Sequence, residues 1–533
     1  MKSEGSLTPT LSNGNLTAAT GGSGGWQNVG TTISVSDDTG KWYWEVSWTT
    51  MAGTYESRIG VAAEGYEFNL DTTSSGLPWL GSATGTSWSL GIDGNSYTGG
   101  SSTAYTSALS VTDVIGVALD TDNHTLTFYK NGSTLGTAYT GVSSSVLTPA
   151  FGFHTNNANT INVNFGAGSF KYTPPTGYKA LNTYNLDDPT ITDGTKHFDT
   201  ILYTGNGTSQ SITGLGFEPD LVWIKNRTTN GYEHFLWDSV RGAGGNKSIN
   251  SDSTNAEGDE NTAAYGYLSS FDAEGFTLTA GTTSSVTINK SSDSYVAWCW
   301  NAGSSTVSNT DGTITSSVRA NTTAGFSIVN WTAEASAGTV GHGLGKIPNL
   351  ILMKTLDSSV FWFVYMSDIG TGKYLKLDTG GGTNTDGTVF GTAPTSSVFS
   401  PGSGFISGNN YGDTIAYCWS EIPGFSKFGK YSGTNAATGN FIYTGFKPAY
   451  VLIKSSTDTG GNWVVLDNKR SLNPLNKYLY PDHTTSEVST YSMANFHSNG
   501  FDILRTGGNV NQAVDDFVFF AFAESPFKYS NAR

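Results

Sequence analysis

The chain has 533 residues, including 67 glycines, and its formal net charge is −16 at pH 7. A phosphate backbone is bound by a basic stripe, so this charge argues against a nucleic-acid-binding protein. Charged residues make up only 13% of the chain and aromatic residues 13%, and no long stretch has a 3.6-residue period, which predicts an all-β protein of about three to four domains.

The N-terminal segment, residues 1–25, is rich in Ser, Gly and Thr, and we expect a flexible tail or an edge strand there. It lacks the apolar region of a secretory signal peptide. No run of about 18 apolar residues occurs, so we expect a soluble protein that does not insert into a membrane. Such a protein would reach the outside of a cell by another route, such as lysis.

The next stretch predicts a series of strands. GKWYWEVSW at 40–48 alternates apolar and polar residues, as a half-buried strand does. RIGVA at 58–62 predicts another strand, and 113–132 predicts two strands about a D-N turn, ending in the N-G turn of a second hairpin. Two further apolar strings, LTPAFGF and TINVNF, complete the set.

Taken in order, GKWYWEV, RIGVA, DVIGVALDTDNHTLTFYKNG, LTPAFGF and INVNFG resemble a SPRY (B30.2-like) domain. The resemblance implies a β-sandwich, which we place at 26–187, followed by a linker at 188–196. It also implies a binding module and not an enzyme, with loops at one end of the sandwich that hold protein or other ligands. Those loops differ between members, so no binding residue is carried over from the family.

Five landmarks then recur three times in the same order. Each set begins with a Gly-rich turn, a proline and an apolar run that ends in a lysine; the lysines are Lys225, Lys354 and Lys454. An aromatic-apolar strand, a lysine with an apolar partner, a Gly-Phe corner and a closing aromatic strand follow. The recurrence predicts three tandem, mutually similar small β-sandwich domains, each with its own core, at 197–302, 324–425 and 427–533. Residues 303–323 are predicted to be a polar linker, and a linear stack and a triangle of domains both remain open.

The Gly-Leu-Gly…Pro…Lys strand and the ending YCWSEIPGF resemble an uncharacterised β-rich module of tailed-phage structural proteins, often found beside a SPRY-like domain. That module has no established activity. The resemblance therefore implies a virion and supplies no mechanism.

The recurring prolines (Pro219, Pro348, Pro448) and the three lysines could form a ligand-binding ridge. We favour a simpler interpretation, in which proline ends a turn and lysine marks the exit of the strand into water, its stem covering apolar surface. Two cysteines, Cys299 and Cys418, lie inside apolar strands, and we predict two separate buried thiols without a disulfide.

No motif predicts catalysis, a metal site or a cofactor. The seven histidines form no metal-binding cluster, although paired carboxylates of a glycosidase remain open because three-dimensional spacing defines them. Asp120–Asn123 predicts a turn, since the Gly and Glu of a calcium loop are missing. The acidic loop 252–261 predicts a solvated segment, with a weak cation site as the alternative.

Scattered aromatic residues in Gly/Ser-rich loops could contact a glycan or a protein. We select Trp79, Tyr105, Tyr232 and Tyr411 as candidate ligand-binding residues, and note Tyr97 beside them. Most of the other aromatic residues must form core.

The function expected from the sequence is that of a non-enzymatic structural protein on the exterior of a tailed-phage virion. It would be a head fibre, a decoration protein or a tail-fibre component, bound to other capsid or tail proteins and contacting a protein or glycan of the host surface. We expect a homo-oligomer, with a trimer favoured. The alternatives are a carbohydrate-binding adhesin or lectin, and a glycan depolymerase.

Overall fold

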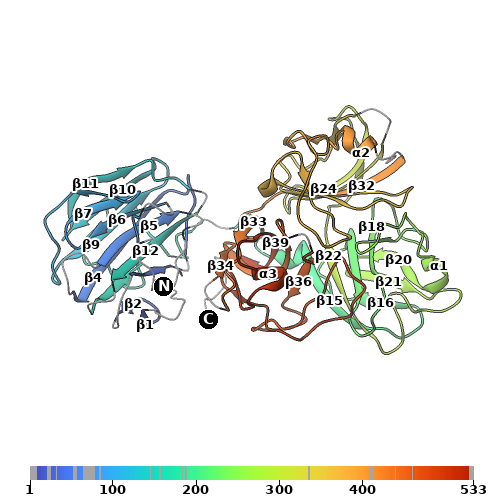
Figure 1. Ribbon diagram of the computed structural model, residues 1–533, viewed down its shortest axis with the longest axis horizontal. Coiled ribbons are helices and arrows are strands. Elements are labelled where there is room, and N and C mark those ends of the chain that lie inside the picture. The colour runs from blue at the N-terminus through green and yellow to red at the C-terminus, as the bar shows by residue number, and fades with distance from the viewer. Residues whose placement is uncertain are drawn as a thin grey trace. The chain divides into compact units, whose positions relative to one another are not determined.

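The computed structural model (Figure 1) divides into two compact units, one of Met1–Asp188 with Thr438–Asn440 and one of Pro189–Ala437 with Phe441–Arg533. The structure describes residues 9–20, 26–31, 33–51, 57–63, 66, 79–82, 86–144, 146–154, 158–182, 184–186, 189–333, 337–407, 412–437, 440–458 and 460–526. Strands dominate both units, which confirms the prediction of an all-β protein. Within the described residues, no helix has the length and apolar character needed to cross a membrane.

The first unit is a sandwich of two sheets. The larger sheet has the order β1-β2-β13-β4-β9-β10-β11, with β14 paired in parallel to β4. Its strands are β1 (Thr10–Ser12), β2 (Thr17–Ala19), β4 (Lys41–Thr50), β9 (Val114–Asp120), β10 (Thr125–Lys130), β11 (Ser133–Thr140), β13 (Thr160–Asn164) and β14 (Lys179–Ala180).

The smaller sheet has the order β3-β12-β5-β6-β7-β8. Its strands are β3 (Trp26–Gly30), β5 (Ser57–Ala63), β6 (Ser87–Gly91), β7 (Asn95–Thr98), β8 (Ser101–Ala104) and β12 (Leu147–His154). Alternate residues of both sheets meet in one core, in which Trp44, Phe128 and Phe151 are fully buried. Hydrophobic burial of these large side chains is the main stabilising contribution to the unit.

The second unit holds the three segments predicted as repeats, here called segment 1 (197–302), segment 2 (324–425) and segment 3 (427–533). In segment 1, a short 3-10 helix, η1 (Gly194–Lys196), leads into a main sheet of order β15-β22-β17-β18-β19 and a small sheet of order β16-β21-β20. The elements are β15 (Phe198–Thr204), β16 (Gln210–Thr213), β17 (Leu221–Asn226), β18 (His234–Asp238), β19 (Ile249–Asn250), α1 (Thr262–Tyr265), β20 (Tyr267–Asp272), β21 (Gly275–Thr279) and β22 (Ser294–Trp300).

Segment 2 has a main sheet of order β23-β24-β25-β32-β27-β28. Two of these strands come from the predicted linker 303–323, where Val318 is buried against the sheet. The elements are β23 (Thr306–Asn309), β24 (Ser316–Asn321), β25 (Phe326–Ala333), β26 (Val340–Gly341), β27 (Leu350–Thr355), β28 (Phe363–Met366), η2 (Ser367–Ile369), β29 (Lys373–Tyr374), β30 (Asn384–Thr385), β31 (Val398–Phe399), α2 (Ser403–Ser407) and β32 (Gly412–Trp419).

Segment 3 has a main sheet of order β33-β39-β35-β36 and a small sheet of order β34-β38-β37. Its elements are β33 (Ser426–Ser432), β34 (Asn440–Tyr443), β35 (Phe446–Ser455), β36 (Val464–Asp467), β37 (Ala494–His497), β38 (Gly500–Ile503), α3 (Gly508–Asn511) and β39 (Asp516–Pro526). In all three main sheets the closing aromatic strand lies between the first strand and the lysine-ended strand, with antiparallel pairing on both sides.

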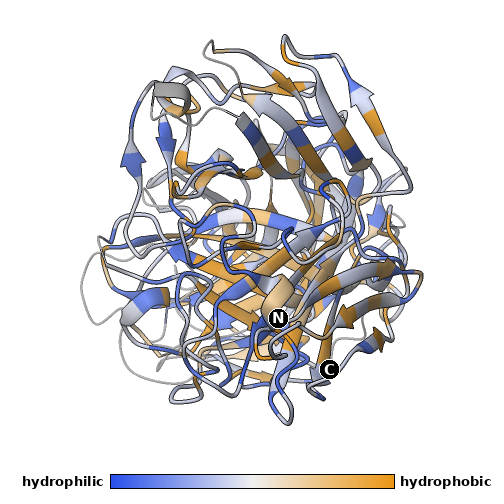
Figure 2. Ribbon diagram, turned by 90° about the vertical axis from the view of Figure 1, so that its right-hand side faces the viewer, coloured by the Kyte–Doolittle hydropathy of each residue, from blue (hydrophilic) through white to orange (hydrophobic). Residues whose placement is uncertain are grey.

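The three main sheets share one hydrophobic core, here called the central cluster. It contains aromatic residues from the closing strand of every segment: Trp298, Trp300, Tyr417, Trp419, Phe520 and Phe522. The Trp300 ring lies 6.0 Å from that of Trp419 and 5.8 Å from that of Phe522, so side chains from all three segments meet there. Figure 2 shows strands that carry runs of apolar residues, drawn in orange.

Segments 1 and 2 each bury a second, separate cluster on the other face of the main sheet. Cys299 lies in the cluster of segment 1 and Cys418 in that of segment 2, both buried and free, as predicted. Each of these segments therefore has a core of its own, as expected from the sequence, and in addition contributes to a core that the sequence did not predict.

Candidate functional site

The lysines that end the recurring strands are buried. Lys225, Lys354 and Lys454 all have no exposed surface, so the interpretation that they leave the strand into water was wrong. Each ammonium group instead donates a hydrogen bond to a backbone carbonyl in the loop after its own strand; the acceptors are Tyr232, Val360 and Gly461. A buried ammonium group needs such acceptors because it has lost its water.

Two of these lysines also reach a neighbouring segment. Lys225 Nζ donates to the Thr484 carbonyl of segment 3 at 3.0 Å. Lys354 Nζ donates to the Thr254 carbonyl of segment 1 at 2.8 Å. Thr254 and Thr484 occupy the same place in their segments, two residues after an aspartate. These lysines therefore help to join segments and do not line a ligand ridge.

An aspartate recurs near each of these lysines: Asp252, Asp378 and Asp482. Each lies five residues after the lysine that has an apolar partner, which is Lys247, Lys373 or Lys477. The aspartate carboxylate accepts the backbone N–H at the start of the aromatic strand: His234 to Asp252 at 3.0 Å, Trp362 to Asp378 at 2.8 Å and Trp463 to Asp482 at 3.2 Å. Burial raises the pKa of all three carboxyl groups, that of Asp482 to about 7. Burial also lowers the pKa of each of the three lysines to about 8, and the nearby carboxylates oppose this shift.

The residue that starts the aromatic strand joins each segment to another in a closed order. Trp362 Nε1 of segment 2 donates to the Asn250 carbonyl of segment 1 at 2.7 Å. Trp463 Nε1 of segment 3 donates to the Lys376 carbonyl of segment 2 at 2.8 Å.

In segment 1 a histidine stands at this position. His234 Nε2 bonds the Tyr480 carbonyl of segment 3 at 3.0 Å, while its Nδ1 accepts from Trp223 Nε1 at 3.0 Å. The three contacts run from 2 to 1, from 1 to 3 and from 3 to 2, so the segments close into a ring.

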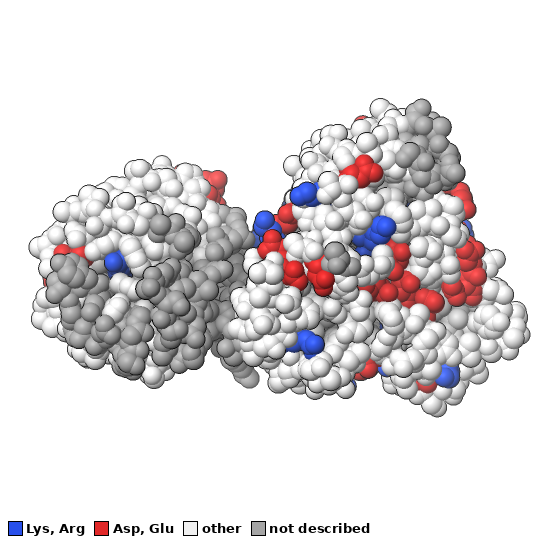
Figure 3. Space-filling model, in the orientation of Figure 1, with Lys and Arg blue, Asp and Glu red and all other residues white. Residues whose placement is uncertain are grey.

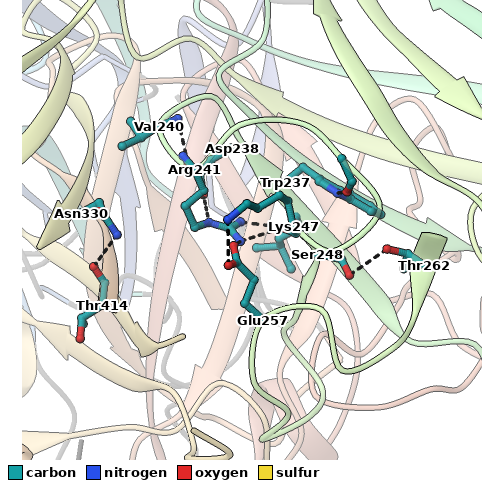
Figure 4. A network of polar contacts seen from close by, with 12 residues as sticks. Trp237, Asp238, Val240, Arg241, Lys247, Ser248, Glu257, Thr262, Asn330 and Thr414 are labelled. Atoms are coloured by element: carbon teal, nitrogen blue, oxygen red, sulfur yellow. Dashed lines mark hydrogen bonds and ion pairs between the residues drawn. The ribbon is translucent and has the colours of Figure 1, made fainter. Parts of the chain in front are cut away.

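A second set of contacts reinforces two of the three junctions. Tyr417 of segment 2 donates its hydroxyl to Asp238 of segment 1 at 2.8 Å, and Asp238 also binds Arg241 at 2.5 Å. Figure 4 shows how Arg241 continues this network to Glu257, at 2.9 Å. Charge-assisted bonds of this kind are stable in the interior because every donor has a partner.

At the junction of segments 1 and 3, Trp298 Nε1 donates to Asp467 at 3.0 Å, and Asp467 binds Arg470 at 2.5 Å. The corresponding residues at the remaining junction are Phe520 of segment 3 and Met366 of segment 2, both in the central cluster. Two junctions are therefore polar, whereas the third has only apolar side chains at these positions.

The burial of Lys354 predicts a dependence of stability on pH. Its pKa is about 8 in the fold against 10.5 when exposed, so between these values the unfolded chain binds one more proton than the folded chain. The contribution of this lysine to the free energy of unfolding is largest above pH 10.5 and falls as the pH decreases to about 8, by up to about 1.4 kcal/mol per pH unit.

Urea unfolding of wild type and of Lys354→Met across this pH range measures the difference in slope. The wild type should gain stability with pH more steeply than the variant. Lys346→Met, which removes an exposed lysine of the same segment, serves as the control and should keep the wild-type slope. Equal slopes for wild type and Lys354→Met would contradict a lowered pKa of Lys354 in the folded protein.

In the first unit, the structure places the predicted ligand contact Trp79 against a buried arginine. The guanidinium carbon of Arg58, on β5, lies 3.8 Å from the ring centroid of Trp79, 3.6 Å from that of Tyr97 and 4.6 Å from that of Trp26. These four residues are here called the arginine–aromatic cluster. Trp26 and Trp79 are half-buried, whereas Arg58 and Tyr97 are 6% and 8% exposed, so the two tryptophans form its open side.

The guanidinium of Arg58 is incompletely bonded. One Nη1 hydrogen bond goes to the Leu80 carbonyl at 3.1 Å, while the buried Nε has no hydrogen-bond partner among the residues that the structure describes. Burial lowers the pKa of Arg58 to about 10, although nearby Tyr97 and Asp93 favour the charge. A cation held among aromatic rings away from water interacts with them by about 2 kcal/mol or more. The cluster thus presents aromatic surface backed by a fixed positive charge.

The other predicted contacts lie elsewhere. Tyr105 is half-buried, packs against Phe128 with ring centroids 6.1 Å apart, and donates its hydroxyl to the Gly136 carbonyl. Tyr232 is in the second unit, with Lys290 Nζ 5.4 Å from its ring centroid. Tyr411 lies outside the described residues. The structure therefore brings together Trp79 and Tyr97, but neither of the other described candidates joins them.

Sequence reasoning missed Arg58 and Trp26. Arg58 lies in the string RIGVA, which predicts a strand, and an arginine inside that apolar string was the available signal. A charged residue on a buried strand requires a partner, so it should have directed attention to the neighbouring aromatic residues.

The acidic turns are built into the fold. Asp120 bonds Lys41 at 2.8 Å and caps its own turn through Asn123. In the loop 252–261, Glu257 pairs with Arg241 and Lys247, and Asp259 accepts the backbone N–H of Ala256. Across the described parts of the chain, no group of three potential metal ligands occurs.

Comparison with known proteins identifies both units. Residues 193–526 match the family model described as a domain of unknown function, DUF7483. Residues 41–168 match the model of the SPRY domain, which confirms that prediction. No curated protein matches the chain.

Solved structures that are similar include the SPRY domain of human HERC1, with 21% identity over 30% of this chain and 94% of that chain and a TM-score of 0.25. A human SPRY domain shows 20% identity over 30% and 97%, with a TM-score of 0.25. Stonustoxin shows 25% identity over 29% and 25%, with a TM-score of 0.23.

Proposed function

The chain belongs to the family of the DUF7483 domain, and we propose that it is a non-enzymatic structural protein of a tailed-phage particle that contacts a partner through its SPRY domain. The arginine–aromatic cluster is the observation that carries this proposal. It combines half-buried tryptophan rings with a buried, incompletely bonded guanidinium, which suits recognition of a partner. The DUF7483 domain serves as the rigid body that carries the recognition unit.

The arrangement of the second unit supports a structural role. Recurring lysine and tryptophan side chains donate hydrogen bonds that join its segments, as the bonds of Lys225, Lys354 and Trp463 illustrate. We infer that the segments are three copies of one module, since the order of their main sheets and their junction contacts correspond. On the face drawn in Figure 3, uncharged residues cover most of this unit, which suits an exterior surface of a particle.

In this proposal the protein is a head fibre, a decoration protein or a tail-fibre component on the outside of the virion. Its partners are capsid or tail proteins and a protein or glycan of the host surface. The sequence resemblance to a module of tailed-phage structural proteins supports this location, and a homotrimer is the arrangement we favour for the appendage.

Mass spectrometry and electron microscopy of purified particles test the location. Particles released from cells that produce the chain should contain peptides of both units in fixed ratio to the capsid protein. Chain that remains in the soluble fraction while particles form without it would contradict a virion role.

The binding role predicts an effect of Trp79→Ala. Removing one half-buried ring of the cluster should weaken attachment of the purified protein to intact host cells by about tenfold, because aromatic anchors dominate contact energies. Flow cytometry of labelled protein measures the attachment. As the control, Tyr184→Ala removes an aromatic ring of the same unit that is 87% exposed, and attachment to host cells should stay unchanged. Equal loss in both variants would contradict a specific site.

A further inference from the structure

A half-buried arginine in segment 3 has no polar partner for its guanidinium among the described residues. Arg505 follows β38 and Tyr491 precedes β37, and these two strands form a hairpin. Beyond the hairpin, Leu504 N–H donates to the Met493 carbonyl at 2.9 Å, which continues the pairing toward both residues. The guanidinium carbon of Arg505 consequently lies 3.6 Å from the ring centroid of Tyr491, a ring that is 48% exposed.

The guanidinium also lies close to a glycine. A Cβ placed on Gly508 would lie 3.0 Å from Arg505 Nε and 3.2 Å from Nη2, and the φ angle of this glycine is +65°. Gly508 therefore provides the space that the guanidinium occupies. The Tyr491 ring and Gly508 both lie against the planar group and restrict its orientation, which leaves its N–H donors at the edges.

Those donors are unused. Within the described residues, Arg505 has no hydrogen bond or ion pair from its guanidinium, although the chain has a net charge of −16. The four other arginines of the second unit that the structure describes each bind a carboxylate: Arg227, Arg241, Arg319 and Arg470. Arg505 is thus the exception in a unit that otherwise pairs its arginines.

Two tyrosine hydroxyls lie near this charge. The Tyr478 and Tyr480 rings are 5.6 Å apart in an edge-on arrangement. Burial raises the pKa of both phenols, that of Tyr478 to about 12, and the positive charge of Arg505 offsets part of each shift. The hydroxyl groups therefore stay protonated and can donate or accept hydrogen bonds beside the guanidinium.

The arrangement is confined to segment 3. Five residues after the Gly-Phe corner, where segment 3 has Arg505, segment 1 has Ala280 and segment 2 has Asn409. Positions shared by all three segments serve the fold, as the buried lysines do. A residue that departs from the shared pattern in one segment only, as Arg505 does, is free of that requirement and is available for function.

We propose that Arg505 and Tyr491 form a binding site for an acidic saccharide, in which Arg505 holds a carboxylate and Tyr491 packs against the apolar face of a sugar ring. This proposal rests on the proposed role at a host surface. Arginine binds carboxylates through two parallel hydrogen bonds, and its orientation here is fixed before the ligand arrives. The hydroxyl of the half-buried Tyr480 supplies a further bond to the sugar.

Calorimetric titration of the full chain with oligogalacturonate, a polymer of uronic acid, tests the site. The wild type should bind, and Arg505→Ala should weaken binding at least about tenfold, because a charge-assisted bidentate contact is lost. Arg505→Lys keeps the positive charge but lacks the two parallel N–H donors of the guanidinium, so it should weaken binding less than Arg505→Ala does. Lys376→Ala removes a cation that lies 3.8 Å from the ring centroid of Phe361 in segment 2 and should bind as the wild type does.

Other outcomes overturn the proposal. Failure of the wild type to bind, or unchanged binding by Arg505→Ala, removes the site. Tighter binding of a poly-glutamate peptide than of oligogalacturonate assigns the site to acidic proteins, and equal binding of a neutral maltooligosaccharide removes the role of the carboxylate. The proposed virion role is measured separately on particles, so particle-bound protein without saccharide binding overturns this inference alone.

Discussion

Replacing Asp467 by alanine is expected to lower the free energy of unfolding of the second unit by about 3–5 kcal/mol. Asp467 is fully buried; one carboxylate oxygen accepts from Arg470 Nε at 2.5 Å and Trp298 Nε1 at 3.0 Å, and the other accepts the Arg470 backbone N–H at 2.9 Å. Arg470 is itself buried, so its charge would lose its nearest counter-charge. Urea unfolding followed by tryptophan fluorescence measures the loss.

The chain supplies a matched control for this variant. In segment 2, Met366 and Ile369 stand where segment 3 has Asp467 and Arg470, and Phe520 stands where segment 1 has Trp298. A triple variant, Trp298→Phe/Asp467→Met/Arg470→Ile, replaces the polar contact by this apolar version. It should cost less than about 1.5 kcal/mol, because no buried charge is left without a partner. A triple variant as unstable as Asp467→Ala would contradict this explanation.

Trp300→Ala is expected to destabilise all three segments together, by about 3–5 kcal/mol. Trp300 is 2% exposed and touches aromatic residues of segments 2 and 3, so the cavity would open in the central cluster. Hydrogen exchange should quicken in β22, β27 and β35 alike. Strands of the first unit, such as β9, should keep their exchange rates because their core is separate.

Trp331→Ala provides the comparison. Trp331 is equally buried but belongs to the cluster that segment 2 does not share. Its loss should quicken exchange most in the strands of segment 2. If Trp300→Ala also quickened exchange in a single segment only, the three segments would be independent domains, and the shared core would not couple their stabilities.

Much of the fold could be predicted because strands carry a local signal. Alternation in GKWYWEVSW and the apolar runs before Lys225, Lys354 and Lys454 correspond to strands β4, β17, β27 and β35. The SPRY domain was recognised from several such strings in order. Cys299 and Cys418 followed in the same way, since a thiol inside an apolar strand is usually buried.

The junctions between segments could not be predicted, because they depend on contacts between distant residues. A lysine at the end of a strand gives the same sequence pattern whether it meets water or a carbonyl such as that of Thr484, 259 residues away. The contact of His234 could not be predicted for the same reason. Its partner is the backbone carbonyl of Tyr480, and every residue has such a carbonyl, so no residue type indicates the contact. Trp79 and Arg58 are only 21 positions apart in the sequence, yet their contact also needed the fold.

The closing contact of the ring has a consequence for synthesis of the chain. His234 and Tyr480 are separated by 246 residues, and a ribosome adds about 5–20 residues per second. The residues that cover Lys225 and His234 therefore leave the ribosome on the order of ten to fifty seconds after segment 1 has been synthesised. During that interval its inter-segment face is open to other nascent chains, so protection by chaperones should matter more for yield than the stability of the finished protein.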